Sequence, residues 1–248
     1  QLGESPDRVY FVGALGIENI EKLELYSKDE LEQIIGFKLG NKSLLITYHP
    51  VTLETNSDLQ LAELLTSLSD LKATKLIFTA PNADSFSTLH SSMIEVFVSK
   101  NRRNAEYLVS MGQKVYLSAL QCVDAIVGNS SSGIIEAPSC KIGTINIGDR
   151  QIGRVMTESI LCCEPITCEI IEAMNTAKSE KFKKIVQRAK CPFGDVNTSE
   201  KIAKIIRSVI QTDIIDLKKQ FYNCPSQSRL HKQYCLTCHK LFDLHEQD

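Results

Sequence analysis

The sequence predicts an α/β fold built on an open parallel sheet. Short apolar runs that suit buried strands alternate along the chain with segments of helical hydrophobic periodicity, at short spacing. The run 43–48 is largely apolar on both faces, which is typical of a parallel sheet covered by helices on both sides. In such sheets ligands bind beyond the carboxyl ends of the strands, so residues at those ends are the first candidates for a site.

Taken in order, the first part of the chain repeats strand and helix. A short apolar run predicts a strand at 9–13, and a helix is expected at 17–23. Ser27 and Glu30 form a capping box, which predicts a helix that ends near Ile35. The strand 43–48 ends at His49-Pro50, and the helix 58–68 carries one apolar face, formed by Leu59, Leu61, Leu64, Leu65 and Leu68.

The cycle then continues to the middle of the chain. We expect strands at 75–79, 115–117, 125–127 and 143–147, and helices at 85–99, 118–122 and 132–137. Beyond the segment 148–154 only helices are expected, at 168–177, at 180–189 and from Thr198 or Ser199 to Ile210. Residues 1–222 are therefore assigned to one α/β unit with its closing helices, and residues 223–248 to an irregular tail.

Composition bounds the class of protein. The 248 residues are 43% apolar and 23% charged with a net charge of −2, so no wholesale binding of nucleic acid or of an anionic membrane is indicated. No apolar run approaches the ~20 residues of a membrane span, and the start Gln1-Leu2-Gly3 resembles no signal peptide. Because the chain lacks an initiator Met, we expect it to start partway into a longer protein. Nine cysteines, several of them in apolar stretches, favour a reduced, cytoplasmic protein.

The stretch 128–138, Gly-Asn-Ser-Ser-Ser-Gly-Ile-Ile-Glu-Ala-Pro, is the strongest candidate site. A strand, a turn of small hydroxylated residues and a helix start together favour an anion, because the first N–H groups of a helix have no internal partner. Glu136, two helical turns further on, suits the vicinal diol of a ribose. We interpret the stretch as a cradle for a nucleoside diphosphate; the alternative is an ordinary helix N-cap.

Other polar residues lie at or just past predicted strand ends: His49, Asn82, Tyr116, Ser130 and Arg150. His49 suits proton or hydrogen-bond donation to a leaving phosphate, unless it is a surface histidine in a turn. Arg150 suits a phosphate, unless it is a solvated loop arginine. Tyr116 suits stacking on a base, unless it is a core tyrosine.

The tail contains Cys235-Leu236-Thr237-Cys238-His239, a match to the haem-attachment pattern. With Cys224 and His231 the same residues are a candidate zinc site. The spacing fits no common zinc finger and no second CxxC pairs with it, so we expect an unstructured tail, no metal and no cofactor.

Several motifs resemble one enzyme family. They are Val12-Gly13-Ala14, Thr47-Tyr48-His49-Pro50, Ala80-Pro81-Asn82-Ala83-Asp84, the serine cradle, Glu136-Ala137-Pro138, and Gly148-Asp149-Arg150-Gln151-Ile152-Gly153-Arg154. In this order, over about 1–222, they resemble the hydrolysing UDP-N-acetylglucosamine 2-epimerases, which open sialic acid biosynthesis. Ser131-Ser132 stand where the non-hydrolysing relatives usually carry Gly-Gly.

The resemblance implies a Rossmann-like domain that forms the C-terminal half of a GT-B fold, with the active site facing an N-terminal domain that this chain lacks. It implies that Ser130 and Ser131 bind the diphosphate near Arg150, and that Glu136 holds the ribose hydroxyls. It also implies that Tyr116 stacks on uracil, and that His49, as a catalytic residue, and Asn82 face the diphosphate and the sugar.

The family reaction eliminates UDP from UDP-GlcNAc, or from a modified analogue, and hydrates the resulting glucal to N-acetylmannosamine. The acidic residues that take the C2 proton belong to the N-terminal domain, so this chain alone is expected to be an inactive half of a homo-oligomeric enzyme. Two alternatives stay open: a GT-B glycosyltransferase and a non-catalytic nucleotide-sugar-binding domain.

Overall fold

The computed structural model describes residues 3–51, 54, 56–82, 87–194, 197–212 and 221–222. The tail 223–248, with its CxxCH motif, and residues 83–86 lie outside the described residues. The chain divides into two compact units, one formed by Asn19–Pro192 and the other by the flanking segments Gln1–Glu18 and Phe193–Asp248. Each unit is described by itself.

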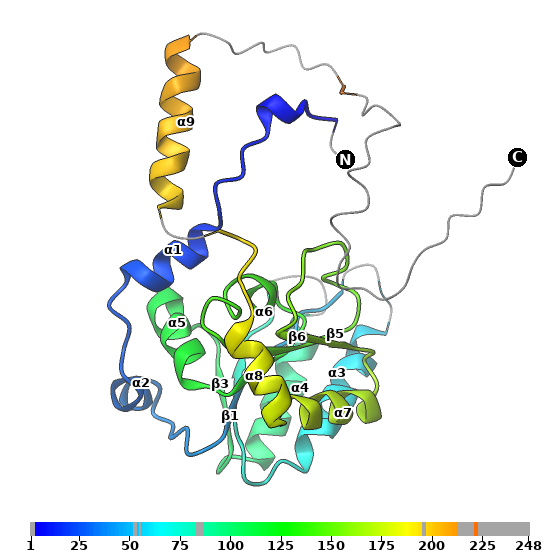
Figure 1. The fold of residues 1–248 in the computed structure, drawn as a ribbon. Helices are drawn as coiled ribbons and strands as arrows, with labels where there is room; N and C mark the ends of the chain where they lie inside the picture. Colours follow the sequence, from blue (N-terminus) through cyan, green and yellow to red (C-terminus); the bar gives the residue numbers. More distant parts are fainter. Residues whose placement is uncertain are drawn as a thin grey trace, which may run out of the picture. The chain divides into compact units, whose positions relative to one another are not determined.

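The larger unit is built on a six-stranded sheet in which every neighbouring pair of strands is parallel (Figure 1). The strand order is β3-β2-β1-β4-β5-β6, so the chain winds outward from the centre first in one direction and then in the other. The strands are β1 (Ser43–Thr47), β2 (Lys75–Thr79), β3 (Ala105–Leu108), β4 (Ala125–Gly128), β5 (Gly143–Ile147) and β6 (Ile160–Cys163). The predicted open parallel sheet is confirmed.

Helices cover both faces of this sheet because successive strand residues point to opposite sides. Leu44 and Ile46 belong to one buried cluster, with residues of α3 (Ser57–Ser69), α4 (Ser87–Lys100) and α7 (Thr167–Ala177). Leu45 belongs to a second cluster on the other face, with residues of α2 (Lys28–Ile35) and α5 (Gly112–Cys122). The remaining helices of the unit are α6 (Ser132–Ile135) and α8 (Glu180–Arg188).

Several local predictions hold and others are wrong. The capping box of Ser27 and Glu30 is present at the start of α2. Residues 115–117 are helical rather than a strand, because the turns of α5 bury Leu117 and Leu120 against the sheet. The edge strands β3 and β6 were not predicted, and Leu59, placed on the apolar face of α3, is 64% exposed.

The smaller unit contains a short 3-10 helix (Pro6–Arg8), the start of α1 (Leu15–Lys22) and α9 (Thr198–Thr212). The strand predicted at 9–13 is absent from this described segment, and Val9, Tyr10 and Phe11 are exposed. The N–H and hydroxyl of Ser199 donate to the Glu18 carboxylate at 2.8 and 2.7 Å, so a residue far away in sequence caps the start of α9.

Candidate functional site

The candidate site lies where the winding of the sheet reverses, between the carboxyl ends of β1 and β4. From β1 the chain moves towards β2, and from β4 it moves towards β5, on the opposite side. The loops that leave these two strands diverge, which opens a crevice in which α/β proteins bind ligands. His49 follows β1 and Ser130 follows β4, so both lie at this point, as predicted.

The two strands approach each other very closely at their carboxyl ends. Gly128 has a φ of +138°, and a Cβ atom there would lie 2.0 Å from the carbonyl oxygen of Thr47. Only glycine fits this position, both sterically and because of its backbone conformation. The glycine that opens the serine stretch therefore sets how closely the serines approach the end of β1.

Asn129 fastens the two strand ends together. Its Oδ1 accepts the backbone N–H of His49 at 2.7 Å, and its Nδ2 donates to the carbonyl of His49 at 2.9 Å. The backbone carbonyl of Asn129 accepts hydrogen bonds from Arg150 Nη1 at 3.1 Å and from Gln151 Nε2 at 2.8 Å. Asn129, which is 1% exposed, thus joins His49 after β1 to the Arg150-Gln151 segment after β5.

The ring of His49 is buried and has a defined tautomer. Its Nδ1 accepts the backbone N–H of Asn82 at 3.0 Å, so in the neutral ring the proton is on Nε2. Nε2 is therefore the ring nitrogen that carries the donor proton in the neutral form. Asn82 lies beside His49, as predicted, but the contact is made by its backbone N–H. Asn82 itself is exposed.

A cavity of about 340 Å³ opens at these strand ends and brings together three predicted residues, His49, Tyr116 and Ser130. Its other walls come from the ends of β1, β2 and β3 and from the start of α5. Thr47 and Thr79, which also line the cavity, share a hydrogen bond of 2.8 Å between their hydroxyls. The volume falls within the range of small-molecule sites.

Tyr116 enters this cavity from α5 and not from a strand end as predicted. Burial raises the pKa of its phenol to about 12, an effect that the facing hydroxyls of Ser132 and Thr47 partly offset. Among the described residues its hydroxyl has no hydrogen-bond partner of normal geometry, and the same holds for the hydroxyl of Ser132. Two buried hydroxyls without partners beside one cavity are groups that a polar ligand can satisfy.

The serine cradle is a single turn of helix. Because α6 has only four residues, Glu136 is its C-cap and stands one turn, rather than the predicted two, beyond the serines. The Ser130 hydroxyl accepts the N–H of Ser132 at 3.3 Å, and Ser131, at the N-cap, makes no capping hydrogen bond with its side chain. The bond from the N–H of Ser132 to the Ser130 hydroxyl is itself of the type that caps a helix, so it does not decide between a cradle and an ordinary N-cap.

Glu136 and Arg150 lie beside the cavity and do not line it. Burial raises the pKa of the Glu136 carboxyl, and the Ser132 hydroxyl opposes the shift. Arg150 is held near Ser130 by its bond to the Asn129 carbonyl. Asn129 and Gln151 stand within the motifs, but their role depends on contacts between distant segments, which spacing cannot reveal.

In the described part of the chain, no helix combines the length and apolarity needed to cross a membrane. The same part contains no group of three or more His, Cys, Asp or Glu side chains placed to hold a metal ion, and its six cysteines are free thiols.

Sequence comparisons identify relatives. A sequence model of the UDP-N-acetylglucosamine 2-epimerase family matches residues 1–207. The polysialic acid biosynthesis protein P7 of Escherichia coli is 37% identical over 227 residues, which are 91% of this chain and 57% of that protein. A hydrolysing GDP/UDP-N,N'-diacetylbacillosamine 2-epimerase of Campylobacter jejuni is 36% identical over 222 residues, 89% of this chain and 57% of that protein. The chain thus spans little more than half the length of these relatives.

Solved structures show the same fold. The S. aureus MnaA–UDP complex matches with a TM-score of 0.64 at 14% identity, over 89% of this chain and 58% of that one. The UDP-GlcNAc 2-epimerase of Neisseria meningitidis bound to UDP-GlcNAc matches with a TM-score of 0.61 at 19% identity, over 83% and 56%. At such identities the likeness establishes the fold, and it confirms the predicted Rossmann-like half of a GT-B structure. Together with the family match over residues 1–207, it shows that this chain belongs to the UDP-N-acetylglucosamine 2-epimerase family.

Proposed function

We propose that this chain is the UDP-binding half of a hydrolysing UDP-GlcNAc 2-epimerase. The observation that carries the proposal is the convergence of His49, Tyr116 and Ser130 on one cavity at the switch point of the sheet. Two relatives that are more than 35% identical support the hydrolysing branch, since one is named a hydrolysing 2-epimerase and the other a polysialic acid biosynthesis protein.

In this proposal the nucleotide lies along the cavity, with uracil against Tyr116 and the diphosphate against Ser130 and Ser131. Arg150, held by the Asn129 carbonyl, faces the phosphates, and Glu136 accepts hydrogen bonds from the ribose hydroxyls. Asn82 and the Nε2–H of His49 face the β-phosphate and the sugar, since Asn82 fixes the other ring nitrogen of His49.

The reaction of the whole protein would proceed in two steps. The C1–O bond breaks as C2 loses its proton, which releases UDP and leaves 2-acetamidoglucal. Water then adds its hydroxyl to C1 and its proton to C2, which gives N-acetylmannosamine. His49 stabilises the departing phosphate oxygen by donating from Nε2, while the base for C2 comes from outside this chain. The substrate is UDP-GlcNAc or a modified analogue, the pathway leads to sialic acids, and the whole protein is a cytoplasmic homo-oligomer.

Calorimetry with UDP tests the binding role. We expect the chain to bind UDP, and expect Ser130→Ala combined with Glu136→Ala to weaken binding by more than tenfold, because charge-assisted contacts contribute about 1.5–3 kcal/mol each. Ser92→Ala combined with Glu180→Ala, both exposed on α4 and α8, is the matched control and should leave binding unchanged. Absence of UDP binding, or equal affinity of the double variant and the wild type, would contradict the proposal.

A separate assay tests the reaction. The uninterrupted reading frame that includes this chain should release N-acetylmannosamine and UDP from UDP-GlcNAc without an acceptor. Transfer of the sugar to an acceptor would instead support a glycosyltransferase, and binding without turnover would support a nucleotide-sugar-binding domain.

A further inference from the structure

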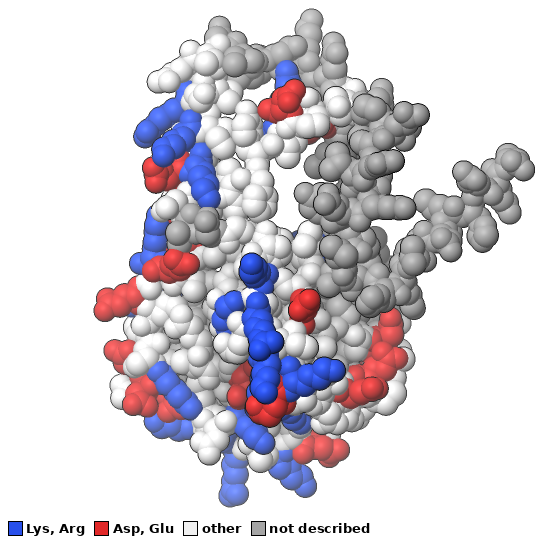
Figure 2. All heavy atoms as spheres, in the orientation of Figure 1, with Lys and Arg blue, Asp and Glu red and all other residues white. Residues whose placement is uncertain are grey.

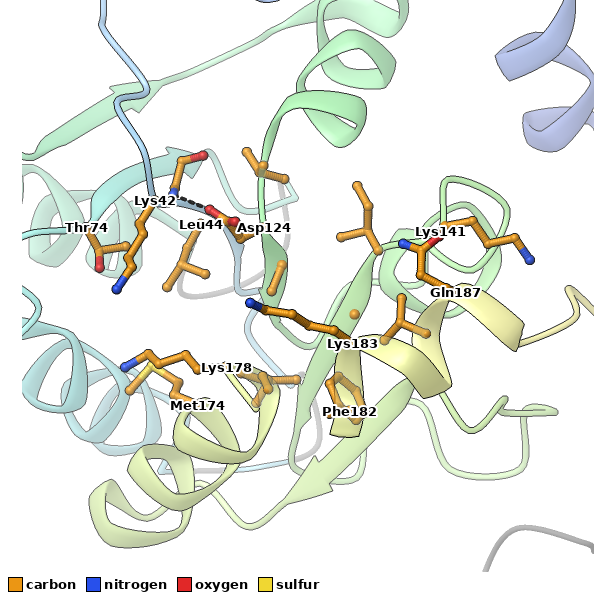
Figure 3. A pocket seen from close by; sticks show the side chains of 18 residues that line it. Lys42, Leu44, Thr74, Asp124, Lys141, Met174, Lys178, Phe182, Lys183 and Gln187 are labelled. Carbon is orange, nitrogen blue, oxygen red and sulfur yellow. Dashed lines mark hydrogen bonds between the residues drawn. The ribbon is translucent and has the colours of Figure 1, made fainter. Parts of the chain in front are cut away.

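A second cavity lies at the amino ends of the strands, whereas the candidate site lies at their carboxyl ends. It has a volume of about 380 Å³ and opens at the amino ends of β1, β4 and β5, where α7 and α8 close it (Figure 3). It belongs entirely to the larger unit. None of its lining residues is shared with the cavity that contains His49 and Ser130.

The floor of this amino-end pocket is apolar. Deep core residues such as Leu45 and Ile77 are 0% exposed, whereas Leu44 and Ile142 in the pocket are 9% and 6% exposed. Val123, Ala125, Met174, Phe182 and Val186 also line the pocket and retain a few percent exposure. The core is thus open to solvent at this point. It offers an apolar surface whose removal from water would favour the binding of an organic ligand.

The mouth of the pocket is cationic. Four lysines line the pocket, Lys42, Lys141, Lys178 and Lys183, against a single acidic residue, Asp124. The ammonium of Lys141 is directed away to the Ala189 carbonyl, which leaves Lys42, Lys178 and Lys183 at the mouth. Asp124 is already engaged, because its Oδ2 accepts the N–H of Ser43 at 2.7 Å. In Figure 3, Lys183 extends from α8 across the pocket, and Lys42 and Lys178 lie at its other side.

The positive charge continues over the neighbouring surface. The outer face of α8 carries the exposed residues Lys181, Lys184 and Arg188, and Figure 2 shows a column of basic side chains over this helix. Lys183 Nζ forms an ion pair with Glu180 Oε1 at 2.7 Å. Because this pair is exposed, it contributes little to stability. An anion at the mouth therefore meets an excess of positive charge in a chain whose net charge is −2.

The pocket is held open by contacts that fix α8. The Phe182 ring packs so closely on β5 that a Cβ atom on Gly143 would lie 2.8 Å from its Cε1. At the other end of the helix, Lys141 Nζ donates to the carbonyl of Ala189 at 2.6 Å. The helix is thus anchored at both ends, and the space between is a formed cavity.

We propose that the amino-end pocket binds a small amphipathic anion, an aryl or alkyl carboxylate or sulfonate. The apolar body lies on Leu44, Met174 and Phe182, and the acid group lies at the mouth beside Lys42, Lys178 and Lys183. A nucleoside diphosphate fits this chemistry poorly, because its polar ribose would cover the apolar floor. The inference does not depend on the function proposed for the site at the carboxyl ends of the strands.

Fluorescence titration of the chain with 8-anilinonaphthalene-1-sulfonate, followed by competition, tests this proposal. We expect saturable binding that octanoate reverses at concentrations at least tenfold below those of octanol, because only octanoate carries the charge. Lys42→Gln combined with Lys178→Gln should weaken octanoate about tenfold. The control Lys181→Gln, which is exposed on α8 and lies outside the pocket, should not change octanoate binding.

A pocket-filling variant gives an independent readout. Ala177→Phe places a ring into the cavity from α7 and should abolish the binding of both anions, while circular dichroism reports an intact fold. Equal competition by octanoate and octanol, an unchanged octanoate affinity in the lysine variants, or displacement of the dye by UDP would overturn the proposal. UDP displacement would place the dye in the nucleotide cavity instead.

Discussion

The rings of Tyr48 and His90 stack at a centroid distance of 6.1 Å and an interplanar angle of 29°, directly behind the backbone that carries His49. Tyr48 is 1% and His90 0% exposed. The Ser57 hydroxyl lies 3.4 Å from Nε2 of His90 and accepts the N–H of Val51 at 3.2 Å. Val51, after β1, is therefore linked through the Ser57 hydroxyl to a buried histidine of α4.

We expect stability to fall at acid pH because of His90. Burial lowers the pKa of His90, and Ser57 and Asp58 oppose the shift. As the pH falls, the imidazole therefore binds a proton in the unfolded chain before it does so in the folded chain. The free energy of unfolding thus decreases as the pH falls through the usual histidine pKa of about 6.5. His90→Phe keeps an aromatic ring that cannot be protonated, so it removes this loss of stability, which amounts to at most about 1.4 kcal/mol per pH unit.

Urea unfolding at pH 7.5 and 5.5 measures the effect. The wild type should lose stability relative to His90→Phe only at the lower pH. A difference between the two proteins that stays constant with pH would contradict a buried, neutral His90.

Asn129→Ala should be strongly destabilising. It removes the two hydrogen bonds that the Asn129 side chain makes with the buried N–H and C=O of His49, at a cost of about 2–4 kcal/mol in the free energy of unfolding. Asn101→Ala, which removes one hydrogen bond to the Phe97 carbonyl, should cost only about 0.5–1.5 kcal/mol. Urea denaturation compares the two variants, and equal losses would show that the His49 contacts add nothing.

Gly128→Ala should separate the ends of β1 and β4. The new methyl group would overlap the Thr47 carbonyl, and the φ of +138° is strained for any side chain, so we expect a loss of about 3 kcal/mol or more. Gly36→Ala also has a positive φ, +67°, but meets no atom within 4 Å, and it should cost only about 1 kcal/mol. Thermal unfolding compares the two variants, and a loss for Gly128→Ala no larger than that for Gly36→Ala would contradict both the overlap with Thr47 and the greater strain at a φ of +138°.

Glu136→Gln should stabilise the chain and weaken UDP binding. Because burial raises the pKa of Glu136, the unfolded chain ionises first, and wild-type stability falls as the pH rises from 4.5 through the folded pKa. At pH 7 the neutral variant should gain on the order of 1 kcal/mol, a shift of a few degrees in Tm. The exposed Glu180→Gln should give no such gain, and a less stable Glu136→Gln would refute the expected cost of burial.

Tyr116→Phe separates the two parts of that side chain. Its hydroxyl is buried without a partner among the described residues, so its removal should leave the stability of the free protein unchanged or raise it by about 1 kcal/mol. If the ring alone stacks on uracil, calorimetry should give the same UDP affinity for the variant. A loss of stability in the free protein would show that the hydroxyl is satisfied internally.

The central elements could be predicted from sequence because burial on both faces makes their pattern plain. All residues of β1, β4 and β5 are buried, and their apolar runs mark them as strands. The edge strand β3 has only Ala105 fully buried, so its Ala-Glu-Tyr-Leu sequence carries no such signal. Tyr116 was misplaced because a short run of β-branched and aromatic residues favours a strand locally, whereas packing of Leu117 and Leu120 imposes a helix.

The residues of the candidate site also fall into those that the sequence could predict and those that it could not. His49 and Ser130 were predicted because each directly follows a recognisable strand. The contribution of Asn129 could not be predicted, since its partner His49 is 80 residues away in the sequence. Spacing identifies which residues end the strands, but the strand order that places two ends side by side depends on the whole sheet.

The pairing of β1 with β4 also determines when the cavity at His49 and Ser130 can form during synthesis. The ribosome releases β1 and β2 before β4, so Ser43–Thr47 cannot meet its second neighbour until Ala125–Gly128 has emerged. Such long-range pairing is slow, and it leaves the edge of a central strand exposed meanwhile. A nascent chain that ends before Gly128 therefore lacks the cavity wall that Ser130 and Ser132 form, and a ligand of this cavity cannot stabilise it until the second half of the sheet arrives.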